Sequence, residues 1–445
     1  MLSNLHFDEQ TLSQRLMNHR REFHRYPEAA WREFFTTSRI ASHLENLGYS
    51  LHFSDEIILR SSIMGRDEVL VAQAQERAIS WGADITYLAH MDGITGVGAV
   101  LDTGRPGPVI ALRFDIDAVE VMESEEDAHR PRFLGFASLA PGVAHACGHD
   151  AHASIGLGIA EVLAQNKDQL NGKIKLLFQP AEEGCRAGKA IAESGWLDDV
   201  DYFFAAHIGM NVPSGTLVCD PQHFLCSSKF DLHFTGKPAH AGIEPNAGQN
   251  ALAAACTAVS QMLAIPRHRD GMTRINIGQM HAGDGRNVIP ASAVLLGETR
   301  GENRALNSYM FQQVENIAEA AAMMHGVKVK LCAQGEAIGL ENDLELVELL
   351  ESVGPESGFT DVLREKDFGA SEDAGYLVDR VQSRGGKAIY CLVGSDLTAG
   401  HHNGDFDIDE SRMLPAVKLL LNAVNALQQP LLRAESASEP SITSN

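Results

Sequence analysis

The stretch His145-Ala146-Cys147-Gly148-His149-Asp150-Ala151-His152 places three histidines, one cysteine and one aspartate within eight residues of the chain. Cys147 and His149 are two residues apart with a glycine between them. That spacing suits a tight loop whose side chains converge on a divalent metal ion of borderline softness. A polar loop around one buried thiol is the alternative interpretation. The rest of the chain favours the metal interpretation, because it supplies further ligands.

Length and composition limit the class of protein. The chain has 445 residues, which is too long for one simple domain and predicts two or three. Hydrophobic residues make up 44% of the sequence, enough to form a sizeable core. The formal net charge of −23 argues against nucleic acid or an anionic membrane surface as a partner. No apolar run reaches about 18 residues, so we expect no membrane-spanning segment.

The cysteines and the first residues of the chain indicate a compartment. Seven cysteines are scattered through the sequence, an odd number without the spacing of a disulfide framework. The N-terminal residues MLSNLHFDEQTLSQRL lack the basic and apolar regions of a secretory signal peptide. Both features predict a cytoplasmic protein, because thiols stay reduced there.

Three short apolar runs each lead into acidic residues or a histidine. These runs and the residues that follow them are 108–114 (PVIALRF) with Asp115 and Asp117, 173–178 (KIKLLF) with Glu182 and Glu183, and 201–206 (DYFFAA) with His207. Ligands bind outside the carboxyl ends of the strands in open α/β sheets. We therefore expect the three strand ends to meet at one crevice.

The flanking segments predict an α/β domain around this crevice. Helices are expected over 8–25, 34–47, 154–166 and 411–427, and a further buried strand over 388–394 (AIYCLVG). Residues 55–105 contain a plausible helix, but no motif in them indicates a function.

From about residue 223 the pattern changes to half-solvated strands that alternate with helices. The expected order is β-α-β-β-α-β, with elements at 229–236 (KFDLHFTG), 249–264, 273–280 (TRINIGQM), 292–301 (SAVLLGETRG), 306–325 and 327–336 (VKVKLCAQGE). This order predicts an inserted α+β, ferredoxin-like domain over 223–335. The catalytic domain is then discontinuous, over 1–222 and 336–429. The polar residues 430–445 are expected to form a disordered tail.

The polar residues of these strand ends and loops can serve a two-metal hydrolase. Such an enzyme needs ligands for the metals, a bridge between them, and a general base for the attacking water. A thiolate beside a metal is deprotonated and can bridge two ions. The adjacent Glu182 and Glu183 point opposite ways, so one can ligate while the other acts as the base. The candidate ligands are Cys147, His149, Glu183, His207 and His402.

Each candidate also has a purely structural interpretation. A glutamate pair can be a solvated turn, and a single histidine such as His207 is more often a satisfied core or rim residue. His401 and His402 are equally suited to be the ligand by residue type. Asp115 or Asp117 can cap a helix, or one of them can orient a ligand imidazole from behind.

An ordered series of motifs resembles the amidohydrolase branch of the di-metal carboxypeptidase and aminoacylase family. That branch includes plant auxin-conjugate hydrolases and bacterial N-acyl amino acid amidohydrolases. The motifs are HACGHDAH (145–152), QPAEEG (179–184), AAHIG (205–209), GKPAHAG (236–242), GRNVIP (285–290), ETRG (298–301) and HHNGDFDIDE (401–410). The resemblance extends over about residues 15–425. It implies an α/β catalytic domain with an inserted lid domain that dimerises.

The same resemblance implies a role for each candidate residue. It implies one general base, Glu182, and five metal ligands: Cys147, His149, Glu183, His207 and His402. His402 is preferred over His401 because the residues from His402 to Phe406 match the family's HN-x-x-F pattern. Three lid residues are implied to meet the substrate carboxylate and the developing oxyanion: His240, Asn287 and Arg300. In related dimers the lid histidine reaches into the active site of the other protomer.

The chain also resembles the branch members that hydrolyse p-aminobenzoyl-glutamate in three further features. These are the long segment 55–105, RPRFLGFAS (130–138) and AGHHN (399–403). We therefore expect hydrolysis of this amide. Another N-acyl amino acid, with an indole-acyl, benzoyl or acetyl group, is an alternative substrate. A further alternative is a chain that depends on a homologous partner. The expected cofactors are two divalent ions, Mn²⁺ or else Zn²⁺, and the expected partner is a second copy or a homologous B subunit.

Overall fold

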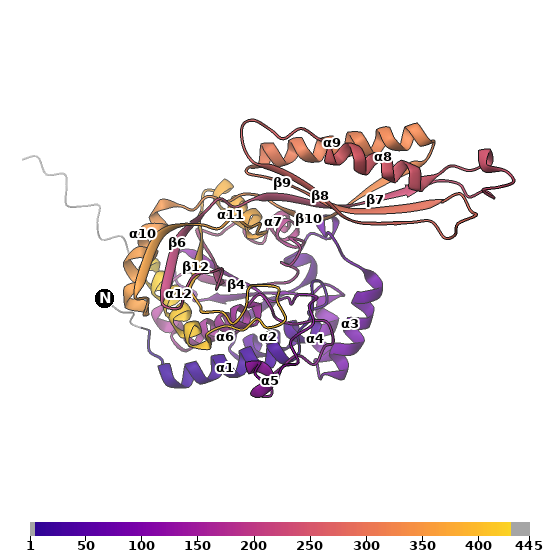
Figure 1. The fold of residues 1–445 in the computed structure, drawn as a ribbon. Helices are drawn as coiled ribbons and strands as arrows, with labels where there is room; N and C mark the ends of the chain where they lie inside the picture. Colours follow the sequence, from indigo (N-terminus) through magenta and orange to yellow (C-terminus); the bar gives the residue numbers. More distant parts are fainter. Residues whose placement is uncertain (1–4, 429–445) are drawn as a thin grey trace, which may run out of the picture.

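The apolar runs of the sequence form the strands of one large sheet, which passes through the lower body of the molecule in Figure 1. The computed structural model describes residues 5–428. The sheet has eight strands in the order β1-β2-β4-β3-β5-β12-β6-β11. Their bounds are β1 Ser50–His52, β2 Val97–Asp102, β3 Val109–Asp115, β4 Lys173–Gln179, β5 Tyr202–Ile208, β6 Thr216–Gln222, β11 Asp361–Asp367 and β12 Lys387–Val393.

The central strands β4, β3, β5 and β12 run parallel to one another and are almost entirely buried. A parallel sheet of this kind needs helices on both faces. One face is covered by α6 (His149–Gln165), against which α1 (Glu9–Arg25), α2 (Phe34–Asn46) and α12 (Met413–Gln428) pack. The short helices α7 (Gly188–Ser194) and α11 (Ala374–Ser383) pack on each other, with α11 against β5 and β12. The expected α/β fold class is thereby confirmed, and β4, β3 and β5 are neighbours whose carboxyl ends meet.

The structure departs from the sequence expectations in two places. Helix α6 begins at His149, so the end of the histidine-rich stretch is already the first turn of the helix that was expected from residue 154. Strands β2, β6 and β11 were not anticipated. β11 (DVLREKD) is mostly charged and largely exposed because it lies at the edge of the sheet, so it shows no apolar run.

The segment 55–105, whose role the sequence does not reveal, supplies a strand near one edge of the sheet and two helices that cover α2. It contains α3 (Glu68–Ser80), α4 (Ile85–Met91) and β2, while the one-turn helix α5 (Arg130–Phe133) follows later. Helices α3 and α4 pack against α2, and β2 pairs with both β1 and β4. Within the described part of the chain, no helix is long and apolar enough to cross a membrane.

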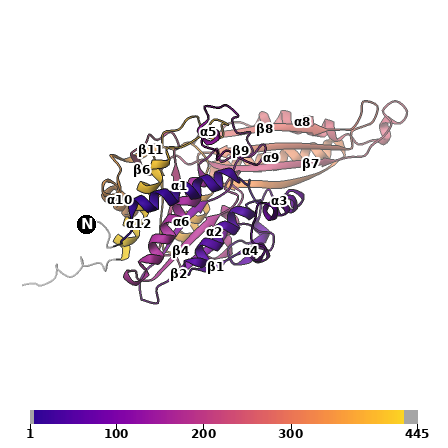
Figure 2. The same cartoon turned by 90° about the horizontal axis from the view of Figure 1, so that it is seen from below.

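A second sheet carries the arm that projects from the body in Figures 1 and 2. Its four antiparallel strands have the order β10-β7-β9-β8, and both of its helices contribute to one separate core. The elements are β7 Cys226–Thr235, α8 Ala251–Leu263, β8 Thr273–Ala282, β9 Ser292–Gly301, α9 Arg304–His325 and β10 Lys328–Ala337. The expected β-α-β-β-α-β order is confirmed. We call this unit the lid; the expected tail over 430–445 lies outside the described residues.

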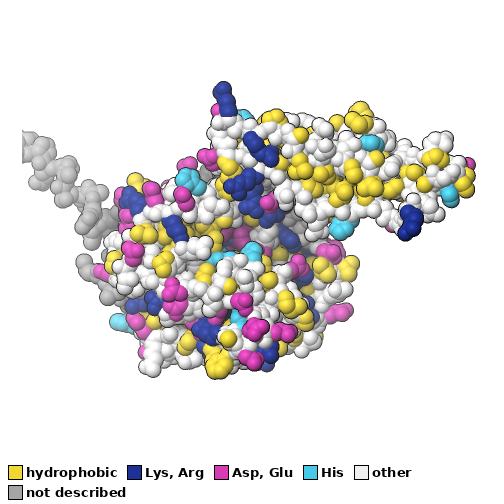
Figure 3. Space-filling model, viewed as in Figure 1, with side chains coloured by type: hydrophobic (Ala, Val, Ile, Leu, Met, Phe, Trp, Pro, Cys, Tyr) yellow, Lys and Arg dark blue, Asp and Glu magenta, His cyan; other side chains and the backbone are white. Residues whose placement is uncertain are grey.

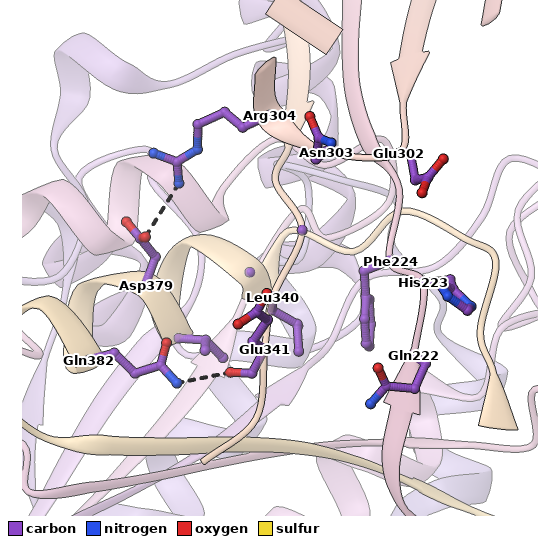
Figure 4. Close-up of a pocket in the computed structure, with 13 residues that line it drawn as sticks. Gln222, His223, Phe224, Glu302, Asn303, Arg304, Leu340, Glu341, Asp379 and Gln382 are labelled. Atoms are coloured by element: carbon purple, nitrogen blue, oxygen red, sulfur yellow. Dashed lines mark hydrogen bonds and ion pairs between the residues drawn. The ribbon is translucent and has the colours of Figure 1, made fainter. Parts of the chain in front are cut away.

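The lid joins the body through two chain segments that run close together. One follows β6 at Gln222, and the other leads from β10 towards α10 (Leu344–Val353). Both segments line a cavity of about 470 Å³ (Figure 4). Across this cavity Arg304 of α9 lies 3.4 Å from the Asp379 carboxylate of α11, and the Gln382 amide donates a hydrogen bond to the Glu341 carbonyl. Polar contacts of this kind tie the base of the lid to the body.

Candidate active site

The expected metal ligands come together at the carboxyl ends of the central strands. Cys147 lies in the loop before α6, and the Cys147 Sγ is 3.5 Å from Nε2 of His207 on β5. Glu183 follows β4, and its Oε1 is 3.3 Å from Nε2 of His402, which follows β12. Segments far apart in the sequence therefore supply one shared donor set, as the parallel order of the strands requires.

Several overlapping donor groups occur here, including one of His149, Glu182 and Glu183, and two of the groups together contain all five expected ligands. Cys147, His149 and His207 form one group, and Cys147, Glu183 and His402 form the other; within each group the donor atoms lie within 4.8 Å of one another. Cys147 belongs to both groups, which is the position that a bridging thiolate needs. Two ions held by these groups would share one ligand.

The hydrogen bonding of these residues tests whether they fit metal ions. Both ring nitrogens of His149 and Oε1 of Glu183 are buried and make no well-directed hydrogen bond among the described residues, although Asp117 and His402 lie within ion-pair distance of them. Such atoms are costly to bury unless something satisfies them. His207 donates its Nδ1–H to the Ile208 carbonyl at 2.8 Å, so the lone pair of Nε2 is left to face Cys147. Thiolate, imidazole and carboxylate donors in this arrangement fit a pair of borderline divalent ions.

Asp117 orders the residues around the donor set. Its carboxylate accepts hydrogen bonds from the backbone N–H groups of Glu182 (3.1 Å) and Glu183 (2.9 Å). The same carboxylate lies 3.4 Å from Nδ1 of His149. Asp117 therefore holds the glutamate pair and one ligand imidazole at once.

The turn that carries the glutamate pair is also held from behind. Ala181 has a φ of +51°, and its N–H donates to the Glu33 carboxylate at 2.7 Å. The other oxygen of Glu33 accepts from the Thr95 hydroxyl at 2.6 Å. Burial, and then the charge of Asp117, raise the pKa of Glu33 to about 8. These contacts hold a backbone conformation that a residue with a side chain rarely adopts.

Asp115, the other acidic residue at the end of β3, makes its closest contacts with partners different from those of Asp117. Asp115 bonds to His152 and to Arg113, whose Nη1 is 2.7 Å from the carboxylate. His152 in turn accepts the N–H of Ile208 at 2.9 Å. Through His152, Asp115 thus holds the backbone next to His207, and its carboxylate also lies 3.8 Å from Nε2 of His149.

Asp150 of the histidine-rich stretch is an anchor for α6. Its carboxylate lies 2.7 Å from Nε of Arg20 and 2.8 Å from Nδ1 of His24, both on α1 and both buried. Burial opposes ionisation of Asp150, but the charge of Arg20 and the bond to His24 dominate and hold its pKa well below the usual range. His145 is fully buried, and burial lowers its pKa to about 3. Asp150 therefore has a structural role.

Glu182 faces the cavity between the donor set and the lid. Its side chain is 8% exposed, and burial, followed by the charges of Glu372 and Glu183, raises its pKa well above the ordinary value. A cavity of about 360 Å³ contains Glu182 together with Cys147, His207 and His402. Figure 3 shows histidine side chains in this hollow beneath the lid, with basic side chains above them. A raised pKa and an open approach suit a group that takes and returns a proton.

The two adjacent histidines differ in their surroundings. His401 accepts the N–H of Met210 at 3.5 Å and packs on Phe406, with ring centroids 5.0 Å apart. Burial lowers the pKa of His401 to about 4. His402 instead belongs to the donor group with Cys147 and Glu183. The geometry thus favours His402 as the ligand, in agreement with the choice made from the sequence.

The three expected lid residues do not lie together. Arg300 of β9 lines the cavity that holds the donor set. His240 and Asn287 are exposed in two loops of the lid, where the N–H of Ala241 donates to the Asn287 carbonyl at 2.9 Å. Neither residue lines that cavity. Within one chain the structure brings only Arg300 to the metal-ligand residues.

Sequence reasoning did not single out Lys229, Glu33 or Glu372. Lys229 and Glu372 line the cavity, and Glu33 supports the glutamate turn. A signal existed for Lys229, because it is a charged residue at the start of the alternating run KFDLHFTG and must face away from the lid core. Glu33 and Glu372 lie in segments without periodicity, where a buried acid has no sequence signature.

Comparison with known proteins agrees with this geometry. The model of peptidase family M20/M25/M40 matches residues 111–426. The chain is 48% identical to a Haemophilus influenzae protein named as a homolog of one of the subunits of p-aminobenzoyl-glutamate hydrolase, over 93% of this chain and 98% of the relative. It is 44% identical to the indole-3-acetyl-aspartic acid hydrolase of Enterobacter agglomerans, over 93% and 95%. The crystal structure of an aminobenzoyl-glutamate utilization protein from Klebsiella pneumoniae superposes with a TM-score of 0.83 at 39% identity, over 95% and 98%.

The chain therefore belongs to peptidase family M20/M25/M40 and is a metallo-hydrolase of that family. The resemblance noted from the motifs is confirmed. The two-domain architecture, with a four-stranded antiparallel lid beside an α/β catalytic domain, is likewise the one found in the Klebsiella structure.

The position of Glu182 predicts the result of removing its basicity. Glu182→Gln keeps the side-chain volume and removes the proton acceptor, so turnover should fall by roughly 10²–10⁴-fold. Metal content, measured by elemental analysis, should stay near that of the unmodified protein. Loss of the metals, with activity restored by adding metal back, would instead make Glu182 a ligand.

The shared position of Cys147 predicts its reactivity. A metal-bound thiolate should resist alkylation until the metal is chelated, whereas the exposed Cys256 should react at the same rate before and after chelation. Cys147→Ser should weaken metal binding, because a serine hydroxyl is a poor anionic ligand at neutral pH. Peptide mass spectrometry after timed alkylation measures both thiols. Rapid modification of Cys147 in the fully metallated protein would contradict the assignment.

Proposed function

We propose that this chain hydrolyses p-aminobenzoyl-glutamate to p-aminobenzoate and glutamate. The observation that carries the proposal is the buried Glu182 beside two donor groups that share Cys147. Relatives at 44–48% identity are named for the hydrolysis of an aromatic acyl group from an acidic amino acid, which supports the choice of substrate. The proposed metal ligands are Cys147, His149, Glu183, His207 and His402.

Two divalent ions bound by these ligands would supply an activated water and polarise the amide carbonyl. We favour Mn²⁺, with Zn²⁺ as the alternative. The residues of the chain move the protons. Glu182 takes a proton from the attacking water and gives it to the nitrogen of the leaving amine. Asp117 keeps Glu182 directed at the cavity, because it holds the backbone on which Glu182 sits.

The lid is proposed to act on the substrate from two sides. Glu298 accepts from Nε and Nη2 of Arg300, and Arg300 is proposed to bind a substrate carboxylate through the Nη1 and Nη2 N–H groups on its other edge. His240 accepts the N–H groups of Gly242 (3.1 Å) and Ile243 (3.2 Å) at Nδ1, so its Nε2 carries the proton. An N–H at that position can donate to the oxyanion that develops at the carbonyl. Asn287, next to His240 in the lid, is proposed to assist in binding.

His240 and Asn287 lie outside the cavity of their own chain, which supports a dimer. We propose that they enter the active site of a second protomer that contacts this chain through the lid. The partner is a second copy of the chain or a homologous B subunit, since one relative is named as part of a hydrolase with more than one kind of chain. Seven free cysteines support a reducing, cytoplasmic location.

Another N-acyl amino acid is the second candidate substrate. The 44% identity to an indole-3-acetyl-aspartic acid hydrolase supports an indole-acyl group, and benzoyl and acetyl groups are further candidates. The test is a panel of N-acyl amino acids with purified protein loaded with Mn²⁺ or Zn²⁺, alone and with a homologous partner. Faster hydrolysis of another acyl group would replace the proposed substrate. Activity only in the presence of the partner would show that the chain depends on it.

The proposed dimer predicts complementation between inactive variants. Mixing Glu182→Gln protomers with His240→Ala protomers should restore activity, because one site of each mixed dimer has both an intact base and an intact lid histidine. Hydrolysis after verified exchange of protomers measures the effect. His90→Ala, at an exposed body residue outside the proposed site, serves as the control and should leave activity intact. Mixed dimers without recovered activity would place His240 outside the other protomer's site.

The fork of Arg300 predicts a defect in binding. Arg300→Lys keeps the charge but removes the two parallel hydrogen bonds to a carboxylate. We expect a large rise in KM for the acyl amino acid, with metal content and the circular dichroism spectrum unchanged. An unchanged KM would show that Arg300 does not contact the substrate.

A further inference from the structure

Lys229 is a cation of the lid that faces the catalytic cavity. The residues Phe230, Leu232 and Phe234 of β7 point into the lid core. Side chains alternate along a strand, so Lys229 must lie on the opposite face. That face meets the body, because Lys229 lines the same cavity as Glu182 and His207.

Lys229 and Arg300 form a pair on this face. Lys229 lies opposite Glu298 across β7 and β9, and Ser227 lies opposite Arg300. Lys229 and Arg300 are therefore diagonal neighbours, which are about 7–8 Å apart in an antiparallel sheet. Both line the cavity that contains the donor set. Two cations at this spacing can each meet one carboxylate of the same small molecule.

The two cations differ in their partners. The Arg300 guanidinium donates to the Glu298 carboxylate through Nε (3.0 Å) and Nη2 (3.2 Å). Lys229 is half-buried, and its closest polar contact is the Cys185 thiol, with Nζ 3.8 Å from Sγ. Cys185 is itself buried and is not a carboxylate. In residues 5–428 no carboxylate lies within ion-pair distance of Lys229.

Among the described residues, none of the acids that line the cavity forms an ion pair with Lys229. Glu372 accepts from the Tyr390 hydroxyl at 2.8 Å and lies 3.1 Å from Nη2 of Arg113. Glu183 faces His402, and Glu182 projects from the turn that Asp117 holds. The Lys229 ammonium therefore has no anionic partner among the described residues. It faces the cavity in which the substrate would lie.

We propose that Lys229 binds the side-chain carboxylate of an acidic amino acid in the substrate and so selects N-acyl glutamate or aspartate over neutral N-acyl amino acids. The inference rests on the proposed amidohydrolase function and on Arg300 as the site of the α-carboxylate. A lysine ammonium is a compact point charge that donates to a carboxylate on a flexible side chain. An uncharged side chain at the same position would leave the cation unpaired, and the neutral substrate would bind less well.

The test compares two substrates that differ only in this charge: p-aminobenzoyl-glutamate and p-aminobenzoyl-glutamine. For Lys229→Gln we expect kcat/KM for the glutamate substrate to fall by about 10- to 100-fold, the scale of a charge-assisted hydrogen bond. The value for the glutamine substrate should change by less than about twofold on the same scale. Lys330→Gln, an exposed position on β10 of the lid, removes the same charge outside the cavity and should preserve the preference.

Binding provides a readout that does not depend on turnover. In the Glu182→Gln background, calorimetric titration should show tighter binding of the glutamate compound than of the glutamine compound, and Lys229→Gln should abolish the difference. An equal loss for both compounds would make Lys229 a general attractor of anions. No loss for either compound would remove it from the site. Each of the last two results overturns the proposal.

The same comparison separates the inference from the proposed function. If the unmodified protein cleaves indole-3-acetyl or benzoyl conjugates in place of p-aminobenzoyl-glutamate, the proposed substrate fails. The Asp/Asn or Glu/Gln pair on the accepted acyl group then tests Lys229. If the unmodified protein does not distinguish acidic from neutral amino acids on any acyl group, Lys229 is not a specificity residue.

Discussion

The carboxylate of Asp117 is the contact on which the catalytic geometry depends. It accepts the backbone N–H groups of Glu182 and Glu183 and lies 3.4 Å from Nδ1 of His149. One buried acid thus connects the end of β3 with the turn after β4 and with the start of α6. If this carboxylate were absent, two backbone donors would be left unsatisfied in a buried turn. The proposed base Glu182 and the proposed ligands Glu183 and His149 would then no longer be held by one shared contact.

The buried charged residues around the site are neutralised by ion pairs within the catalytic domain. Arg20 meets Asp150 and Asp407, with contacts of 2.7 Å to each, and Arg113 meets Asp115 at 2.7 Å. Such pairs add little stability by themselves, since desolvation offsets much of their attraction. The contacts of Arg20 join α1 to the start of α6, and Asp115 joins the end of β3 to α6 through His152. A donor set that must be correct to within fractions of an ångström benefits from that rigidity.

The sequence predicted the elements that are buried or strictly periodic, and it failed where tertiary contacts decide. The runs at β3, β4 and β5 are recognisable by their continuous apolar residues, and the motifs after them locate the donors. β11 was not predicted, because a strand at the edge of the sheet tolerates charged residues. The start of α6 was predicted too far along the chain. That error arose because Gly148, with a φ of +91°, turns the chain directly into the helix. The supporting role of Glu33 depends on a contact with Ala181, 148 residues away in sequence. No local pattern encodes such a contact.

In the lid, the order of residues in the sequence does not predict which of them lie close together. His240, Asn287 and Arg300 occur in one inserted domain, and motif reasoning treats them as one group. The structure separates them, because only Arg300 lies on the sheet face that meets the body of its own chain, whereas His240 and Asn287 occupy exposed loops. Lys229 joins Arg300 because β7 and β9 are paired, although 71 residues separate the two in sequence. Under the proposed function the lid has two parts: a sheet face that carries Lys229 and Arg300 beside the cavity of its own chain, and loops that carry His240 and Asn287 away from that cavity. The proposed dimer accounts for both parts, because each protomer would then bring its lid loops to the active site of the other.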